Sequence, residues 1–288
     1  RVLARSRDEA APVRPSSPLL DLAEQTPPAD VIGMIGTYLD LAKLLGRRTG
    51  ELHMALASDA GDPAFAPEPI SALYQRSKYQ SMRNLTGRVL RQLRTRLSKL
   101  PTAVRPMAEG LLAREDKLLK RFEGLLKAKL TGARIRCHGN LHLGQVLYTG
   151  KDFVIIDFEG DRDKPLPERR RKRISVKDVA GMLRSFHYAA FTALIDDTVV
   201  RPEDRPLAEP WAHVWALWVS AAYLGAYLEA TKGAEFLPKT REELAIVLDS
   251  AVMEKALSEL GSELRSKSAW VSVPLQGIAE ALDADTAK

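Results

Sequence analysis

Apolar residues recur at every third or fourth position over most of the chain, which is the spacing of amphipathic helices. Between residues 27 and 57 this spacing predicts one long helix, with proline in its first turns. The same pattern predicts further helices over residues 77–100, 103–130, 175–195 and 211–231, and after residue 240. Residues 202–210 are expected to form a polar loop, and residues 270–275 are expected to be extended.

Two of these helices begin with the residues of a capping box, in which a hydroxyl and an acidic side chain satisfy the first N–H groups. Ser175 with Asp178 has this spacing, and Thr240 with Glu243 has it again. For Asp178 we favour a cap that also orients the preceding loop. His53, near the end of the first helix, is expected to be a hydrogen-bonded structural residue.

A short hairpin interrupts the helical pattern. Residues 146–148 and 153–156 are mostly β-branched or aromatic, and a Thr-Gly-Lys-Asp segment separates them. Such runs on either side of a glycine-containing turn predict two antiparallel strands. The expected fold is therefore mainly helical with one small β-hairpin, and the region from 135 to 160 is its centre.

Polar side chains gather in the two loops that flank this hairpin. The entering loop carries His138, Asn140, His142 and Gln145, and the leaving loop begins with Asp157 and Glu159. A tight hairpin brings the two loops side by side. Carboxylate and amide oxygens are the ligands that Mg²⁺ takes, so we predict a site for Mg²⁺ and phosphate oxygens here.

The spacing is similar to that of protein kinases, which use H-R-D-x-x-x-x-N followed by D-F-G. Here His138-Gly139-Asn140 is followed after four residues by Gln145, and then by Asp157-Phe158-Glu159-Gly160. In this correspondence Asn140 takes the position of the base. Gln145 and Asp157 take the positions of the metal ligands. The pattern indicates a phosphotransferase.

The string from Cys137 to Gly160, continued by residues 165–170 and 178–186, resembles bacterial maltokinases, and most of all those fused behind a trehalose synthase. The resemblance runs from about Leu19 to Leu275. It implies an aminoglycoside-phosphotransferase-like kinase fold and transfer of the ATP γ-phosphate to maltose, giving maltose 1-phosphate. Mg²⁺ and ATP are the implied cofactors, and a trehalose synthase domain is the implied partner.

Composition predicts that residues 1–18, which are rich in Pro, Ser, Ala and Arg, are a linker or tail. The resemblance implies that residues 19–288 are a kinase-like C-terminal lobe. No Gly-rich phosphate loop and no ATP-anchoring lysine is recognised in the sequence, so the N-terminal ATP lobe is expected to lie outside this chain.

Roles follow for individual residues. Asn140 and Asp157 would be catalytic, and Gln145 and Asp157 would hold the metal. His142 and Lys255 would contact the sugar, Lys255 as part of a Glu-Lys-Ala motif that resembles the maltose-site motif of the family. Three further residues would support the site: His138, Glu159 and Asp178.

Three positions depart from the family pattern and keep a second reading open. Asn140 stands where the resembling kinases have Asp, and an amide cannot accept the proton of the sugar hydroxyl. Loss of a general base typically costs about 10²–10⁴-fold in rate. Ser258 and Ser262 stand where tyrosines are expected. The alternative is a degenerate, non-catalytic sugar-binding or docking module attached to a trehalose synthase, so enzymatic activity is left open.

Composition limits the class of protein, its compartment and its partners. A hydrophobic content of 45% and a charged content of 28% are ordinary for a soluble globular protein, and no apolar run approaches membrane-spanning length. Cys137 is the single cysteine, so no intrachain disulfide can form, which fits the cytoplasm. The net charge is +6 and the densest basic run covers residues 169–173, for which a solvated loop is favoured over nucleic-acid binding. No membrane or nucleic-acid partner is expected.

Overall fold

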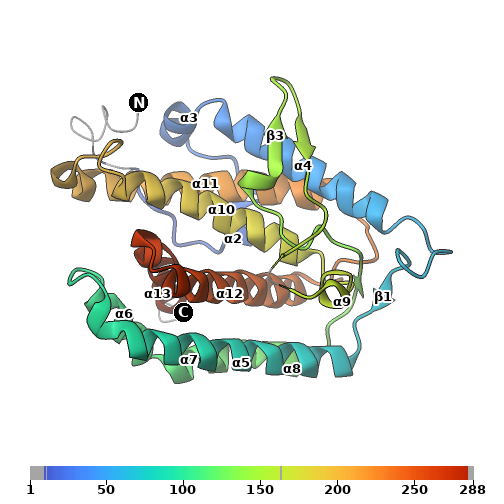
Figure 1. The fold of residues 1–288 in the computed structure, drawn as a ribbon. Helices are drawn as coiled ribbons and strands as arrows, with labels where there is room; N and C mark the ends of the chain where they lie inside the picture. The colour runs from blue at the N-terminus through green and yellow to red at the C-terminus, as the bar shows by residue number, and fades with distance from the viewer. Residues whose placement is uncertain (1–9, 11, 163, 285–288) are drawn as a thin grey trace. The chain divides into compact units, whose positions relative to one another are not determined.

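The computed structural model describes residues 10, 12–162 and 164–284 (Figure 1). Of the segment expected to be a linker, residues 1–9 and 11 lie outside this description. The chain divides into two compact units. We call them the hairpin unit, Arg1–Glu68 with Arg134–Leu237, and the helical unit, Pro69–Ala133 with Pro238–Lys288. Among the described residues, no helix combines the length and the apolar character that crossing a membrane requires.

Among the described residues, the hairpin unit contains the β-hairpin and six α-helices. These elements are α2 (Leu19–Leu22), α3 (Ala29–Ile35), α4 (Tyr38–Leu56), η2 (Leu143–Gln145), β3 (Val146–Tyr148), β4 (Phe153–Ile155), α9 (Leu166–Arg169), α10 (Val176–Ile195), η3 (Pro202–Asp204) and α11 (Arg205–Ala230). The short strands β1 (Glu68–Pro69) and β2 (Ala133–Arg134) lie where the chain passes from one unit to the other.

The core of the hairpin unit forms where α11 packs against α4 and α10. The two helices α4 and α11 approach so closely that their contact requires glycine. A Cβ atom at Gly46 would lie 2.1 Å from the carbonyl oxygen of Tyr223, and one at Gly50 would lie 2.7 Å from Cβ of Ala230. The rings of Tyr223 and Tyr227 are fully buried here, as part of the core.

The single helix predicted for residues 27–57 is wrong, because the structure has two helices, α3 and α4, with a break at Gly36. Gly36 has φ +65°, in the left-handed region where glycine alone is unstrained. It ends α3, and the chain turns before α4 begins. Helical spacing of apolar residues continues through the break, so the pattern alone does not reveal it.

The polar loop predicted for residues 202–210 is also wrong. The short helix η3 leads directly into α11, which begins at Arg205. Pro206 stands in the first turn, where the missing N–H has no partner to lose. Pro210 lies inside the helix and removes one hydrogen bond from its second turn. Prolines near a helix start therefore do not exclude the helix.

The helical unit consists of two long helices and several short ones. Its elements are α5 (Ala72–Arg96), η1 (Leu97–Lys99), α6 (Arg105–Leu112), α7 (Glu115–Phe122), α8 (Gly124–Lys127), α12 (Arg241–Ser266), η4 (Ala269–Val271) and α13 (Ser272–Ala284). Helix α12 packs against α5 and α13, and α13 packs against α6. At the start of α12, Thr240 Oγ1 accepts from Glu243 N at 3.2 Å, which is the hydroxyl half of the predicted capping box. The Glu243 carboxylate does not complete the box, because it accepts from the backbone N–H of Thr131 at 2.6 Å.

Two predictions fail in the helical unit. The helix expected over residues 103–130 is three helices, α6, α7 and α8. Between α6 and α7, the Arg114 Nε donates to the carbonyl of Gly110, which the backbone N–H of residue 114 would use in a continuous helix. The segment 270–275 is helical rather than extended. Leu275 is buried together with residues 278 and 282, which is helical spacing.

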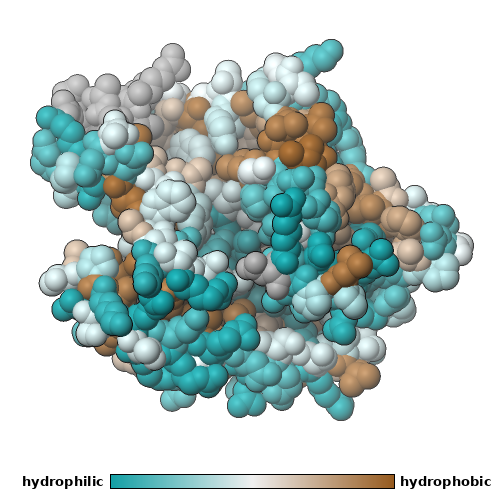
Figure 2. Space-filling view, in the orientation of Figure 1, coloured by the Kyte–Doolittle hydropathy of each residue, from teal (hydrophilic) through white to brown (hydrophobic). Residues whose placement is uncertain are grey.

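Hydrophobic residues are also exposed on the hairpin. Leu147, Tyr148 and Val154 are each about half exposed, and Figure 2 shows hydrophobic colour at the position of β3 and β4.

Candidate active site

The hairpin brings the two polar loops together. Strands β3 and β4 pair antiparallel, with Val146 opposite Ile155 and Tyr148 opposite Phe153. The ladder continues by one bond beyond the strands, from Ile156 N to the carbonyl of Gln145 at 3.0 Å. The end of the entering loop and the start of the leaving loop are therefore neighbours.

A bidentate ion pair fastens the hairpin turn to α4. Arg48 Nε and Nη2 each donate to one carboxylate oxygen of Asp152, both at 2.8 Å. The hydrogen bonds from Arg48 and then from the backbone N–H of Phe153 lower the pKa of Asp152 to about 2. Bidentate arginine–carboxylate pairs fix orientation as well as distance, so the turn has a defined position against the helix.

A pocket of about 340 Å³ opens between the loops. Its lining includes four residues singled out in the sequence, Asn140, Gln145, Asp157 and Glu159. The remaining predicted residues are placed elsewhere. His138, His142 and Asp178 lie outside this lining, and Lys255 lies on α12, in the helical unit. We call this cavity the carboxylate pocket, because Asp161 adds a third acidic group to it.

The side chains in the carboxylate pocket fit a hard divalent cation. The Oε1 atom of Gln145 is buried and has no hydrogen-bond partner, and a buried unpaired acceptor calls for an explanation. Asp157 has φ +61°, a strained conformation for a non-glycine residue that is typical of functional positions. Carboxylate and amide oxygens together are the ligand set that Mg²⁺ prefers.

The amide of Gln145 has a second neighbour in His142. The Nδ1 atom of His142 accepts from the backbone N–H of Gly144 at 3.1 Å, so a neutral ring carries its hydrogen on Nε2. This Nε2 lies 3.4 Å from Nε2 of the Gln145 amide. With the amide nitrogen beside His142, the amide oxygen Oε1 is the atom left without a hydrogen-bond partner.

A cation that the sequence reading did not single out also lines the pocket. Arg162 is among the lining residues, and its Nε donates to Glu159 Oε1 at 2.7 Å. Glu159 is thus paired with a guanidinium three residues later. The three-residue spacing of Glu159 and Arg162 was the sequence signal that could have identified Arg162.

His138 contacts both of the loops that flank the hairpin. It is buried, and its Nε2 lies 2.7 Å from the carbonyl of Ile156, while its Nδ1 accepts from the backbone N–H of Asn140 at 3.3 Å. Its ring also packs against Phe158, with the ring centres 5.1 Å apart. One imidazole thereby contacts backbone on both sides of the hairpin.

A second buried group holds the entering loop. The carboxylate of Asp178, on α10, accepts the backbone N–H of His138 at 2.7 Å and that of Gly139 at 2.8 Å. The predicted capping box at Ser175 does not form, because this carboxylate is turned toward the loop, and Ser175 makes no side-chain cap. Sequence spacing identified Asp178 but assigned its oxygens to the wrong N–H groups.

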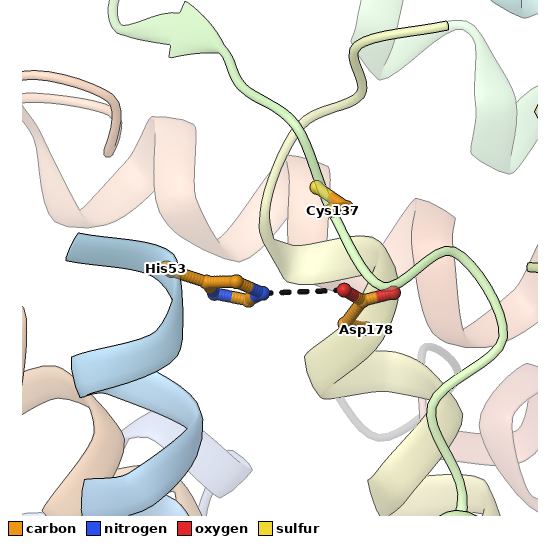
Figure 3. Close-up of side chains that lie close together, drawn as sticks. All are labelled: His53, Cys137 and Asp178. Atoms are coloured by element: carbon orange, nitrogen blue, oxygen red, sulfur yellow. Dashed lines mark hydrogen bonds and ion pairs between the residues drawn. The ribbon is translucent and has the colours of Figure 1, made fainter. Parts of the chain in front are cut away.

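His53, from α4, completes this network (Figure 3). Its Nε2 lies 3.2 Å from Asp178 Oδ2, and its Nδ1 lies 3.1 Å from the hydroxyl of Tyr227, which in turn donates to Ser175 Oγ at 3.0 Å. Burial alone would raise the pKa of Asp178. The hydrogen bond and charge of His53 outweigh that effect, and the pKa lies below its ordinary value.

The same cluster offers a possible metal site, which we reject. The ligand atoms of His53, Cys137 and Asp178 lie within 4.8 Å of one another (Figure 3). Burial, followed by the charge of Asp178, raises the pKa of the Cys137 thiol well above its usual range. Its Sγ donates to the carbonyls of Ile135 and Arg173 at 3.5 and 3.6 Å. A protonated thiol beside a carboxylate that already accepts three hydrogen bonds is a poor metal ligand.

Comparison with known proteins gives partial matches. No protein-family model matches the chain. A glucosamine kinase of Mycolicibacterium smegmatis is 41% identical over 56 residues, which are 19% of this chain and 14% of that protein. A glucosamine kinase of Streptacidiphilus jiangxiensis is 23% identical over 186 residues, which are 65% of this chain and 37% of that protein.

Solved structures show the same fold. Glucosamine kinase in crystal form B superimposes with a TM-score of 0.67 at 20% identity, over 92% of this chain and 57% of that one. The complex of glucosamine kinase with glucosamine, ADP and inorganic phosphate gives 0.68 at 19% identity, over 93% of this chain and 60% of that one. The chain shares the fold of these solved structures, and it spans less than two thirds of the length of these relatives.

Proposed function

We propose that this chain is the catalytic and acceptor-binding part of an ATP-dependent sugar phosphotransferase. The observation that carries the proposal is the carboxylate pocket, in which Asn140, Gln145, Asp157 and Glu159 meet at the two ends of one hairpin. The kinase-like spacing of these residues and the sugar-kinase-like fold support it. On this proposal ATP is the phosphate donor, and the nucleotide-binding lobe is supplied from outside the chain.

Asp157 and Gln145 would hold Mg²⁺, with Glu159 beside them. The ion would supply neutralisation of the charge on the transferring phosphoryl group. Asn140 would orient the acceptor hydroxyl through its amide oxygen without removing the proton. Because the transition state of phosphoryl transfer is loose, positioning by these side chains is expected to support slow turnover even without a strong base.

Two acceptors are candidates. Maltose follows from the resemblance of the residue 137–160 string to maltokinases. Glucosamine follows from the names of the relatives. The acidic lining of the pocket does not separate the two acceptors, because the proposed Mg²⁺ would neutralise the charge of Asp157 and Glu159. His142 and Lys255 remain proposed sugar contacts for either acceptor.

A non-catalytic sugar-binding or docking module, attached to a trehalose synthase, is the second candidate. Asn140 favours it, since an amide replaces the expected base. Ser258 and Ser262 favour it too, because both lie exposed on α12 and neither offers an aromatic face to a sugar.

The test compares the intact protein with its Asn140→Asp and Asp157→Asn variants. ADP release with Mg²⁺-ATP is measured with maltose, with glucosamine and without sugar. Asn140→Asp is expected to raise sugar-dependent turnover by about 10²-fold or more, and Asp157→Asn to abolish it. Sugar binding by calorimetry without turnover in any of the three proteins supports the docking module. Turnover that survives Asp157→Asn contradicts the proposed metal site.

A further inference from the structure

The basic run at residues 169–173 does not form the uniformly solvated loop that the sequence suggested. Arg170 and Arg171 are exposed, but Lys172 is buried. Its ammonium donates to the carbonyls of Pro63 and Ala66 at 2.7 and 2.5 Å. The run is thus anchored at one position, and its remaining cations have a fixed place on the hairpin unit.

Those cations line a small cleft next to the carboxylate pocket. The cleft encloses about 30 Å³ and is partly open to solvent. Its lining includes two carboxylates and five cationic side chains, namely Lys164, Arg169, Arg171, Arg173 and Lys177. We call it the basic cleft. Its charge is opposite in sign to that of the carboxylate pocket.

The local ion pairs leave this excess of positive charge in place. Glu168 is 3.6 Å from Arg173 and neutralises it in part. Within the described part of the chain, Lys164 and Arg171 have no ion-pair partner. Arg169 donates through Nη1 to the carbonyl of Glu159 at 3.2 Å, while its Nε is buried without a partner. An unpaired buried donor costs free energy that a bound anion would recover.

The basic cleft and the carboxylate pocket share a wall. Gly160 and Asp161 line both. Gly160 has φ +75°, and a Cβ atom there would lie 3.6 Å from the Arg169 side chain and 3.6 Å from the carbonyl oxygen of His138. The loop after β4 therefore runs between the two cavities, with opposite charges on its two sides.

We propose that the basic cleft is a binding site for a phosphate group, separate from the carboxylate pocket. Arginine forks match the geometry of phosphate oxygens, and five cationic side chains around a cleft that is partly open to solvent suit a phosphate group at its mouth. The phosphate can come as inorganic phosphate or as the phosphate group of a sugar phosphate. The site stands on its own residues and does not depend on the proposed transferase activity.

The experiment measures the melting temperature of the intact protein against phosphate concentration, with chloride at equal ionic strength as the reference. A ligand that binds the folded state raises the melting temperature in a concentration-dependent way. The variant Lys164→Ala with Arg171→Ala removes two exposed cations of the cleft. The matched control is Arg88→Ala with Arg91→Ala, which removes two exposed cations from α5.

Phosphate is expected to stabilise the wild type and the control equally. The cleft variant should bind phosphate about tenfold more weakly or worse, because charge-assisted hydrogen bonds are lost. Asp157→Asn should leave the phosphate response unchanged. An equal response in the cleft variant and the control, or no response in the wild type, overturns the proposal. So does a response that Asp157→Asn removes, since the phosphate would then occupy the carboxylate pocket.

Parallel titrations with a hexose 1-phosphate and with the matching neutral sugar identify the source of the phosphate. A response to inorganic phosphate and sugar phosphate alike supports a site for the free anion. A response to the sugar phosphate alone supports a site for a phosphorylated sugar. A response to the neutral sugar that equals the response to its phosphate contradicts recognition of a phosphate group.

Discussion

Asp178 connects three parts of the hairpin unit through one buried carboxylate. It accepts two backbone N–H groups of the entering loop and contacts His53 on α4. Replacing it with asparagine puts an NH₂ group against these donors and leaves at least one buried donor without an acceptor. Because an unsatisfied buried donor costs about 1–3 kcal/mol, we expect Asp178→Asn to lower the free energy of unfolding in urea by about that amount.

Asp59 provides the control for this prediction. It also accepts two backbone N–H groups, from Gly61 at 2.9 Å and Asp62 at 3.1 Å, but it is exposed. Asp59→Asn is expected to change the free energy of unfolding by about 1 kcal/mol or less. Equal losses of unfolding free energy in the two variants would show that burial of Asp178 does not make its hydrogen bonds more stabilising.

At the scale of single residues, the sequence predicts which side chains line the pocket better than it predicts the residues that hold the hairpin and the entering loop in place. Asn140, Gln145 and Asp157 meet as predicted because a short hairpin determines how its two flanking loops lie. Arg48 and His53 come from α4, about a hundred residues earlier, and only the folded packing brings them to the turn and the loop. No local spacing encodes such long-range contacts. The roles of the pocket residues stay predictions.

At the scale of the secondary-structure elements, the Arg48–Asp152 ion pair holds the hairpin to α4, and the stability it contributes depends on pH. The pKa of Asp152 is about 2 in the folded protein, below its ordinary value of 3.8. Its ionised form is therefore favoured by folding. The contribution of ionised Asp152 to the free energy of unfolding is fully present above about pH 4 and is lost as the pH falls toward 2.

We expect the difference in unfolding free energy between the wild type and Asp152→Asn to be constant from neutral pH to about 5 and to shrink below 4. Urea titrations at a series of pH values measure it. Arg48→Gln should show the same narrowing, since it removes the other half of the pair. A difference that persists unchanged to pH 2.5 would show that the ion pair does not stabilise the hairpin.

The break between α3 and α4 gives a second prediction for the elements. Gly36 has φ +65°, and a Cβ atom there would meet nothing within 4 Å, so substitution strains only the backbone. Gly36→Ala should lower the free energy of unfolding by about 1–2 kcal/mol. Gly87 is the control, because it lies inside α5 with only the Arg91 side chain nearby. Gly87→Ala should raise stability by about 0.5–1 kcal/mol.

If the two substitutions change the free energy of unfolding in opposite directions, the conformation of Gly36 is what ends α3. Changes in the same direction would contradict this. The comparison also explains why helix existence was predicted better than helix boundaries. Apolar spacing continues across Gly36 and Arg114, while the events that end the helices are a positive φ at one and a side-chain bond to Gly110 at the other.

For the whole molecule, the single cysteine reports on unfolding. Cys137 is buried, and burial raises the pKa of its thiol well above its usual range. A thiol-specific reagent at pH 8 is therefore expected to label the native protein at a rate at least about 10²-fold below that of the urea-unfolded chain. Labelling should rise with the unfolding transition followed by circular dichroism. Rapid labelling without urea would mean that the loop before Asn140 opens in the folded state.

The close contact between α4 and α11 bears on how the chain is made. Gly46 meets the backbone of Tyr223, so one half of this interface leaves the ribosome long before the other. At about 5–20 residues per second, α4 waits roughly 10–40 s for its partner. The apolar face of α4 has no α11 to cover it during that time. Slowed synthesis or a shortage of chaperones should therefore reduce the yield of folded protein, and crowding by nascent chains should promote its aggregation.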